Sequence, residues 1–215
     1  MDSEAFANEI SARVARYCEG LADRLPSYSY VDLPDDGARA KVMKSRLWNE
    51  VRSGEIMGSW LRTTPEMDVK STMAESVHEE FEHAQILSAV LQDRGDDPWD
   101  YRTVPAQVAM FNAFEGLGTT VERMAAFPLA GEGVAVYMIQ RGLASNSVPE
   151  WVSAPYRAIF ADEEGHGSYP ASVLAKYAKS DEQQDAVRRA VEMSLVLRQQ
   201  YFDNLDLWVY EDRAW

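Results

Sequence analysis

The sequence predicts an all-α protein built on a four-helix bundle, with one further helix at each end. Helical periodicity runs through most of the 215 residues, and strand-like alternation of apolar and polar residues is scarce. Two Glu-x-x-His words also occur, although the chain contains only three histidines. No repeat or linker divides the sequence, so we expect residues 1–215 to form a single domain.

The first half predicts three helices. An N-terminal apolar stripe at helical spacing stops near Pro26, and the segment 27–37 ends in an Asp-Asp-Gly turn that favours an irregular connection. A long helix is expected over about 38–62 and another over about 66–94, which should end at a glycine. The stripe of the N-terminal helix consists of Phe6, Ile10, Val14, Tyr17, Leu21 and Leu25.

The second half predicts three more helical regions. The region 105–143 should be bent or interrupted at Pro128. Pro149 is well placed to start the next helix, which should kink or end near Pro170. A final helix is expected over 181–210. Its C-terminal end is too apolar for a free surface helix, so we expect it to pack over the bundle, with a homodimer contact as the alternative.

Composition restricts the partners and the location. The formal net charge of −14 argues against binding to nucleic acid or to an anionic membrane, since both need basic surface. No apolar run approaches the roughly 18 residues of a membrane span, and the acidic start of the chain lacks the pattern of a signal peptide. With Cys18 as its one cysteine, the chain is expected in a reducing cytoplasm.

The two Glu-x-x-His words, that is the sequence motifs Glu80–His83 and Glu163–His166, are the candidate metal-binding sites. Residues three apart lie on one face of a helix, so each word directs a carboxylate and an imidazole the same way. Either word alone would favour a surface ion pair. In both predicted helices, however, the pair replaces hydrophobic residues in the middle of an apolar stripe, where a surface ion pair has no reason to lie. Together the words therefore favour metal ligation.

Register selects a third carboxylate, Glu50. It interrupts the apolar stripe of the helix 38–62, and a buried carboxylate needs a partner because burying it alone is very unfavourable. If the helices 38–62 and 66–94 are antiparallel about a turn near residue 64, Glu80 is level with residues 48–50. Glu55 is the competitor, but it lies on a more polar row of the same helix.

The same argument selects a fourth carboxylate, Glu132. With the next turn centred near residue 147, Glu163 is level with residue 131 or 132, and an apolar run follows from Val134. Glu122 is the second choice. Glu115 shares the same stripe but should lie several turns too far along the helix.

Three further polar residues flank the words. His78 lies off the ligand row and is expected at the surface or beside the ligands. Glu79 and Asp162 each precede a ligand glutamate, and a carboxylate there could accept the free N–H of a ligand histidine. The alternative for both is a solvent-exposed acid.

This order of residues resembles the ferritin-like di-iron carboxylate superfamily over about residues 38–177. Length and spacing are similar to aldehyde-deformylating oxygenases and to the catalytic subunit of phenylacetyl-CoA epoxidase. The resemblance implies a metal-binding bundle with six ligands, namely Glu50, Glu80, His83, Glu132, Glu163 and His166. One departure is clear: Glu82 and Gly165 stand where many relatives have arginine.

The resemblance implies two iron ions, with manganese as the alternative metal, because carboxylates and imidazoles suit both. It predicts an O2-dependent oxygenase or oxidase acting on a small, mostly apolar organic substrate, supplied with electrons by a donor protein. The alternatives are a ferroxidase or iron-storage protein, a di-manganese catalase, and a partner subunit whose site is vestigial.

Overall fold

The structure is a computed structural model that describes residues 1–23, 25–163 and 168–211, without the side chains of residues 161–163. Every regular element in these residues is helical, which confirms the predicted all-α class. None of the described helices is long and apolar enough to cross a membrane.

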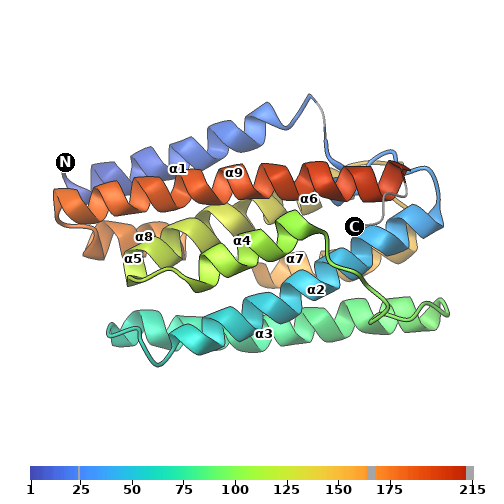
Figure 1. The fold of residues 1–215 in the computed structure, drawn as a ribbon, viewed down its shortest axis with the longest axis horizontal. Coiled ribbons are helices and arrows are strands. Elements are labelled where there is room, and N and C mark those ends of the chain that lie inside the picture. The colour runs from blue at the N-terminus through green and yellow to red at the C-terminus, as the bar shows by residue number, and fades with distance from the viewer. Residues whose placement is uncertain (24, 164–167, 212–215) are drawn as a thin grey trace.

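The helices follow one another along the chain with short connections (Figure 1). Their bounds are α1 Ser3–Gly20, η1 Ser27–Ser29, α2 Asp36–Trp60, α3 Met67–Asp93, α4 Pro105–Glu115, α5 Thr120–Met124, η2 Ala125–Glu132, α6 Gly133–Leu143, α7 Glu150–Glu163, α8 Tyr169–Tyr177 and α9 Asp181–Glu211.

Helices α2 and α3 form a long hairpin at one side of the molecule (Figure 1). Asp35 caps the start of α2 by accepting a hydrogen bond from the amide of Ala38. The hairpin brings residues near 50 level with residues near 80, as its predicted antiparallel register requires. Its inner face is apolar and buried, with Met43, Leu47, Met57, Met73 and Leu87 each at most 2% exposed.

Helix α9 runs the length of the molecule between α1 on one side and α4, α5 and η2 on the other (Figure 1). Tyr201, Phe202 and Leu205 near its C-terminal end are fully buried. The prediction that this apolar end packs over the bundle is therefore confirmed within the described chain.

The region 105–143 differs in part from the prediction. The α-helical pattern is broken around Pro128, as predicted, but the chain leaves the helix at residues 116–119, after α4, which was not predicted. Thr119 and Glu122 form a capping box that starts α5, so the helix begins anew at that point. Pro128 lies within η2, a π-helix that continues α5 into α6. A π-helical turn has wider hydrogen-bond spacing and accommodates the missing proline N–H without ending the helix.

The first helix is also shorter than predicted. It ends at Gly20, and Leu21 is its C-cap residue. The chain then turns through η1, whose Ser29 carbonyl approaches Gly142 of α6 so closely that a β-carbon on that glycine would lie 2.6 Å from the oxygen. Because glycine has no β-carbon, Gly142 permits the N-terminal connection to lie against α6.

This close approach predicts opposite effects of alanine at two helical glycines. Gly142→Ala should lower the free energy of unfolding by about 1–3 kcal/mol because backbone atoms must move apart. Gly58→Ala in α2 has nothing within 4 Å of the added carbon and should raise stability by roughly 0.5–1 kcal/mol through helix propensity. Urea unfolding followed by circular dichroism measures both. Equal stability of the two variants would contradict this account.

Candidate metal centre

Three of the predicted ligands come together in the described structure. Glu50 of α2 and Glu80 and His83 of α3 each offer a ligand atom, and these atoms lie within 4.8 Å of one another. Glu80 is 6% exposed and His83 is 2% exposed. The distance from His83 Nδ1 to Glu50 Oε2 is 3.8 Å. Two carboxylates and one imidazole thus converge below the surface of the α2–α3 hairpin.

Electrostatic interactions lower the pKa of Glu50, whose side chain is 17% exposed. Burial raises the pKa of its carboxyl, but the interactions with His83 and Glu80 and the positive charge of Arg46 outweigh it. The resulting pKa lies below the usual value for glutamate. Arg46 lies one turn before Glu50 on α2. The carboxylate is therefore available as an anionic metal ligand at neutral pH.

Glu132 lies at the end of η2 and lines two cavities that Glu80 also lines. His83 lines one of them and Glu50 the other. Four predicted ligands thus surround one region of the interior. The side chain of Glu163 and the whole of His166 lie outside the described residues, as does the side chain of Asp162.

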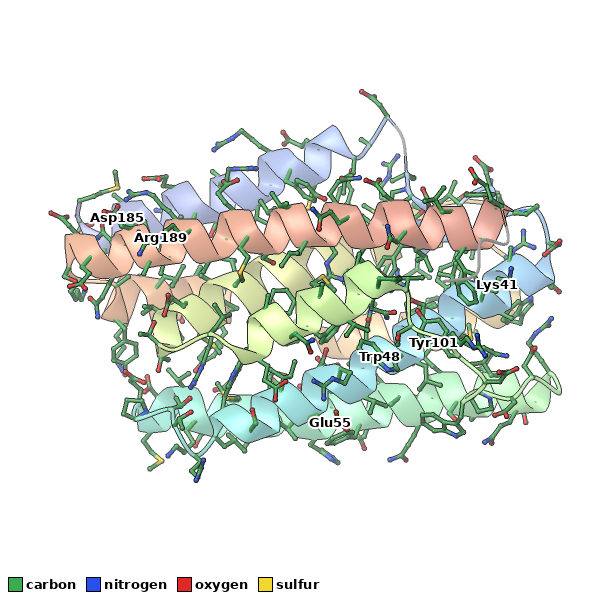
Figure 2. All side chains as sticks on the ribbon, in the orientation of Figure 1. Lys41, Trp48, Glu55, Tyr101, Asp185 and Arg189 are labelled. Carbon is green, nitrogen blue, oxygen red and sulfur yellow. The ribbon has the colours of Figure 1, made fainter. Side chains whose placement is uncertain are left out.

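The carboxylates rejected by the register argument lie elsewhere. Glu55, labelled in Figure 2, is exposed and pairs with Arg52 of the same helix. Glu115 is exposed and also contacts Arg52. Glu122 accepts hydrogen bonds at the start of α5. His78 is exposed and lies 3.5 Å from Glu82, which agrees with its expected surface position.

The larger cavity has a volume of about 110 Å³. Its polar end is formed by Glu79, Glu80, His83 and Glu132. The rest of its wall is mainly apolar and comes from α2, α3, α5, η2, α6 and α8. This wall consists of Met57, Thr72, Met73, Ser76, Met124, Pro128, Leu129, Gly133, Val136, Tyr169 and Pro170.

A smaller and more polar cavity, of about 40 Å³, lies against Glu50, Glu80 and Glu132. Two buried arginines line it, Arg46 of α2 and Arg198 of α9. Neither arginine was predicted from the sequence to line the site. For Arg46 a signal existed, since it precedes Glu50 by one helical turn. For Arg198, which approaches from the far end of the chain, the sequence holds no such signal.

A buried hydrogen-bond network fixes α2 just before Glu50. Gln107 of α4 donates to the carbonyl of Ser45 at 3.0 Å and to the amide oxygen of Asn49 at 2.7 Å. Asn49 in turn donates to the hydroxyl groups of Tyr28 and Tyr201, each at 3.3 Å. Because buried polar groups are strongly unfavourable when unsatisfied, this network holds the backbone of α2 in one register against α4 and α9.

The π-helix is held in place by α9. Ser194 donates to the carbonyl of Ala126 at 2.6 Å, and Arg198 donates to the carbonyl of Gly131 at 3.0 Å. π-Helical segments have irregular carbonyl positions that such donors can satisfy, and they occur frequently at functional sites. Here the segment ends at Glu132, so these two bonds set the position of that carboxylate.

The donor set fits a hard or borderline divalent metal ion. Carboxylate oxygen and imidazole nitrogen suit iron, manganese and zinc, and the close approach of two carboxylates in a buried site is relieved by a cation between them. Glu50, Glu80, His83 and Glu132 are the described residues that could hold such ions.

Comparison with known proteins shows a structural likeness without a sequence family. No family model matches the chain, and no curated protein matches it. A domain of unknown function with a heme oxygenase-like fold from Shewanella denitrificans OS217 superposes with a TM-score of 0.73 at 15% sequence identity. The match covers 97% of this chain and 97% of that chain. The chain therefore has an all-α heme oxygenase-like fold, and this likeness establishes the fold alone.

Asp68 links α3 to α8. Its carboxylate accepts hydrogen bonds of 2.7 Å from Lys176 and from Tyr177, and its backbone carbonyl accepts one from Tyr169 at 3.4 Å. Tyr169 also lines the cavity. The bonds from Lys176 and Tyr177 lower the pKa of Asp68 to about 2.

This lowered pKa predicts an acid-dependent loss of stability. A carboxyl whose pKa falls on folding stabilises the protein above its ordinary pKa, and that contribution is lost as pH falls toward the folded-state value. The stability difference between wild type and Asp68→Asn should therefore be constant near neutral pH and disappear between about pH 4 and pH 2. Urea unfolding across that range measures it. Asp185→Asn is the control, since Asp185 pairs with Arg188 of its own helix, and a pH-independent Asp68 difference would contradict the prediction.

Proposed function

We propose that the protein is a non-haem di-metal oxidoreductase that uses O2 to oxidise a small, mostly apolar organic substrate. The observation that carries this proposal is the convergence of Glu50, Glu80 and His83, of which Glu80 and His83 lie at the polar end of an otherwise apolar cavity. Iron is the metal we propose, with manganese as the alternative. Among di-iron oxygenases, the chain resembles aldehyde-deformylating oxygenases and the catalytic subunit of phenylacetyl-CoA epoxidase in length and ligand spacing.

The proposed ligands are Glu50, Glu80, His83, Glu132, Glu163 and His166. Position along α7 supports the fifth ligand: Ile159 lines the smaller cavity, and Glu163 follows one helical turn later on α7. His166 completes the second Glu-x-x-His word. When bound, a di-iron centre would supply the electrons and the Lewis acidity needed to activate O2.

The side chains around the proposed centre would hold its charge, exclude water and position the substrate. Glu50, Glu80 and Glu132 would hold the metal charge inside the protein, and the interactions of Glu50 with His83, Glu80 and Arg46 lower the pKa of its carboxyl. The apolar wall, including Met73 and Leu129, excludes water and positions a substrate carbon next to the carboxylate end. Electrons would come from a donor protein, and we propose no docking surface for it.

The first prediction concerns metal content. Wild type loaded anaerobically with iron should hold about two metal ions per chain by inductively coupled plasma mass spectrometry, as the two-metal ligand set requires. His83→Ala and Glu163→Ala should each lose most of this metal because each removes one donor. Glu55→Gln, which alters an exposed carboxylate of α2, is the control and should keep full occupancy.

The metal content distinguishes the proposed oxidoreductase from the alternative functions. Little metal in the wild type would reject the di-metal proposal and leave a non-catalytic helical protein. Two manganese ions with peroxide disproportionation would favour a catalase, and many iron ions per chain would favour iron storage.

The second prediction concerns the cavity. Leu129→Trp should fill much of it, so O2 consumption stimulated by apolar test compounds should fall at least tenfold because the substrate no longer fits. Metal content should stay at the wild-type value. Val196→Trp, at an exposed position of α9, is the matched control and should leave O2 consumption unchanged. Wild-type stimulation in Leu129→Trp would show that the substrate binds elsewhere.

A further inference from the structure

We infer that the smaller cavity is a binding site for a small oxyanion, held by the guanidinium groups of Arg46 and Arg198 beside the metal centre. This inference rests on the proposed function, because the metal ions set the charge of the cavity. The ligand class is a carboxylate or an equally small oxyanion, supplied either as a free ion or as the head group of an organic acid that extends into the larger cavity.

The two arginines are unusual in their burial. Arg46 is 1% exposed and Arg198 is 3% exposed, and both line the cavity. Among the described residues neither guanidinium lies within 4 Å of a carboxylate, although buried arginines are normally paired. The Nε atom of each is buried without a hydrogen-bond partner in the described structure.

Both guanidinium groups are held firmly. Arg46 donates to the carbonyl of Tyr28 at 2.7 Å, and its guanidinium carbon lies 3.8 Å from the centre of the Tyr28 ring and 4.9 Å from that of Tyr156. Arg198 is held by its bond to the carbonyl of Gly131. Since one nitrogen of each fork is anchored to backbone, the remaining donors are preorganised, and a guanidinium fork matches a carboxylate in geometry.

Charge links anion binding to metal binding. The described charged groups around this cavity are two arginines and three glutamates, which gives a sum of −1. Two divalent ions would raise that sum to +3, or to +2 if Glu163 supplies a fourth carboxylate. The metal-free protein should therefore repel a small anion, and the loaded protein should attract one. By reciprocity, the anion should also strengthen metal binding.

Size restricts the ligand. The cavity volume of about 40 Å³ is small, and the metal ions would occupy part of it, so the bound head group is limited to a few non-hydrogen atoms, as in formate. The two cavities share walls at Glu80, Glu132 and Val136. An acid with an apolar chain could therefore place its head between the arginines and its chain in the larger cavity.

The test uses the full chain loaded with zinc, which binds the same ligand types without redox chemistry. Zinc content is counted by mass spectrometry, and formate is titrated by calorimetry. We expect formate to bind the zinc-loaded protein at least tenfold more tightly than the metal-free protein. Arg198→Gln should weaken formate binding at least tenfold when wild type and variant are compared at matched zinc occupancy, since a glutamine amide can still donate to the carbonyl of Gly131. Arg189→Gln, an exposed position of the same helix labelled in Figure 2, is the matched control and should bind as wild type does.

Each outcome decides a different claim. Two zinc ions with no formate binding, or with equal binding in wild type and Arg198→Gln, would overturn the anion site and leave the metal centre intact. A chain that holds no zinc would overturn the proposed function and the anion site together.

Crystals of zinc-loaded wild type in bromide give a test that needs no variant to fold. An anomalous peak between the two guanidinium groups is expected, and its absence would overturn the site.

A second titration identifies the source of the oxyanion. Tighter binding of hexanoate than of formate, lost in Leu129→Trp while formate binding persists, would support the head group of an organic acid. Equal binding of the two anions in the wild type would support a free ion.

Discussion

The buried approach of Glu50, Glu80 and His83 is the constraint on which the rest of the structure depends. Two carboxylates and an imidazole whose ligand atoms lie within 4.8 Å carry a large desolvation penalty, so the surrounding elements must hold them together. The Gln107–Asn49 network fixes α2, the hairpin fixes α3, and α9 fixes η2 through Ser194 and Arg198. Many of the buried hydrogen bonds thus help to position Glu50 and Glu132.

Periodicity was sufficient to predict most of the fold. The hairpin of α2 and α3, the long α9 and its buried C-terminal end follow directly from apolar spacing and capping residues. The interruption after α4 was not predicted because Pro128 was taken as the break in this region, whereas the capping box at Thr119 decides the start of α5. The π-helix could not be predicted, since proline within a helix ordinarily signals a kink and no local pattern reveals widened hydrogen bonding.

The candidate site was predictable where ligands lie at helical spacing and where short connections fix the register. That is why Glu50 could be aligned with Glu80 from sequence alone. Arg198 shows the limit of this reasoning, because a buried arginine that donates to the carbonyl of a distant helix has no sequence pattern of its own. Its role depends on which distant elements close over it. The ligand roles of Glu163 and His166 rest on sequence and remain predictions.

The position of α9 has a consequence for the order of assembly during synthesis. The residues that form the acidic centre precede residue 167, yet the hydrogen bonds that hold η2, and with it Glu132, come from Ser194 and Arg198. A ribosome therefore releases the acidic groups well before it releases the helix that fixes one of them. Until α9 emerges, the carbonyls of η2 lack these two donors, so the bonds that set the position of Glu132 cannot yet form. Under the proposed function, full metal affinity would therefore belong only to the finished polypeptide.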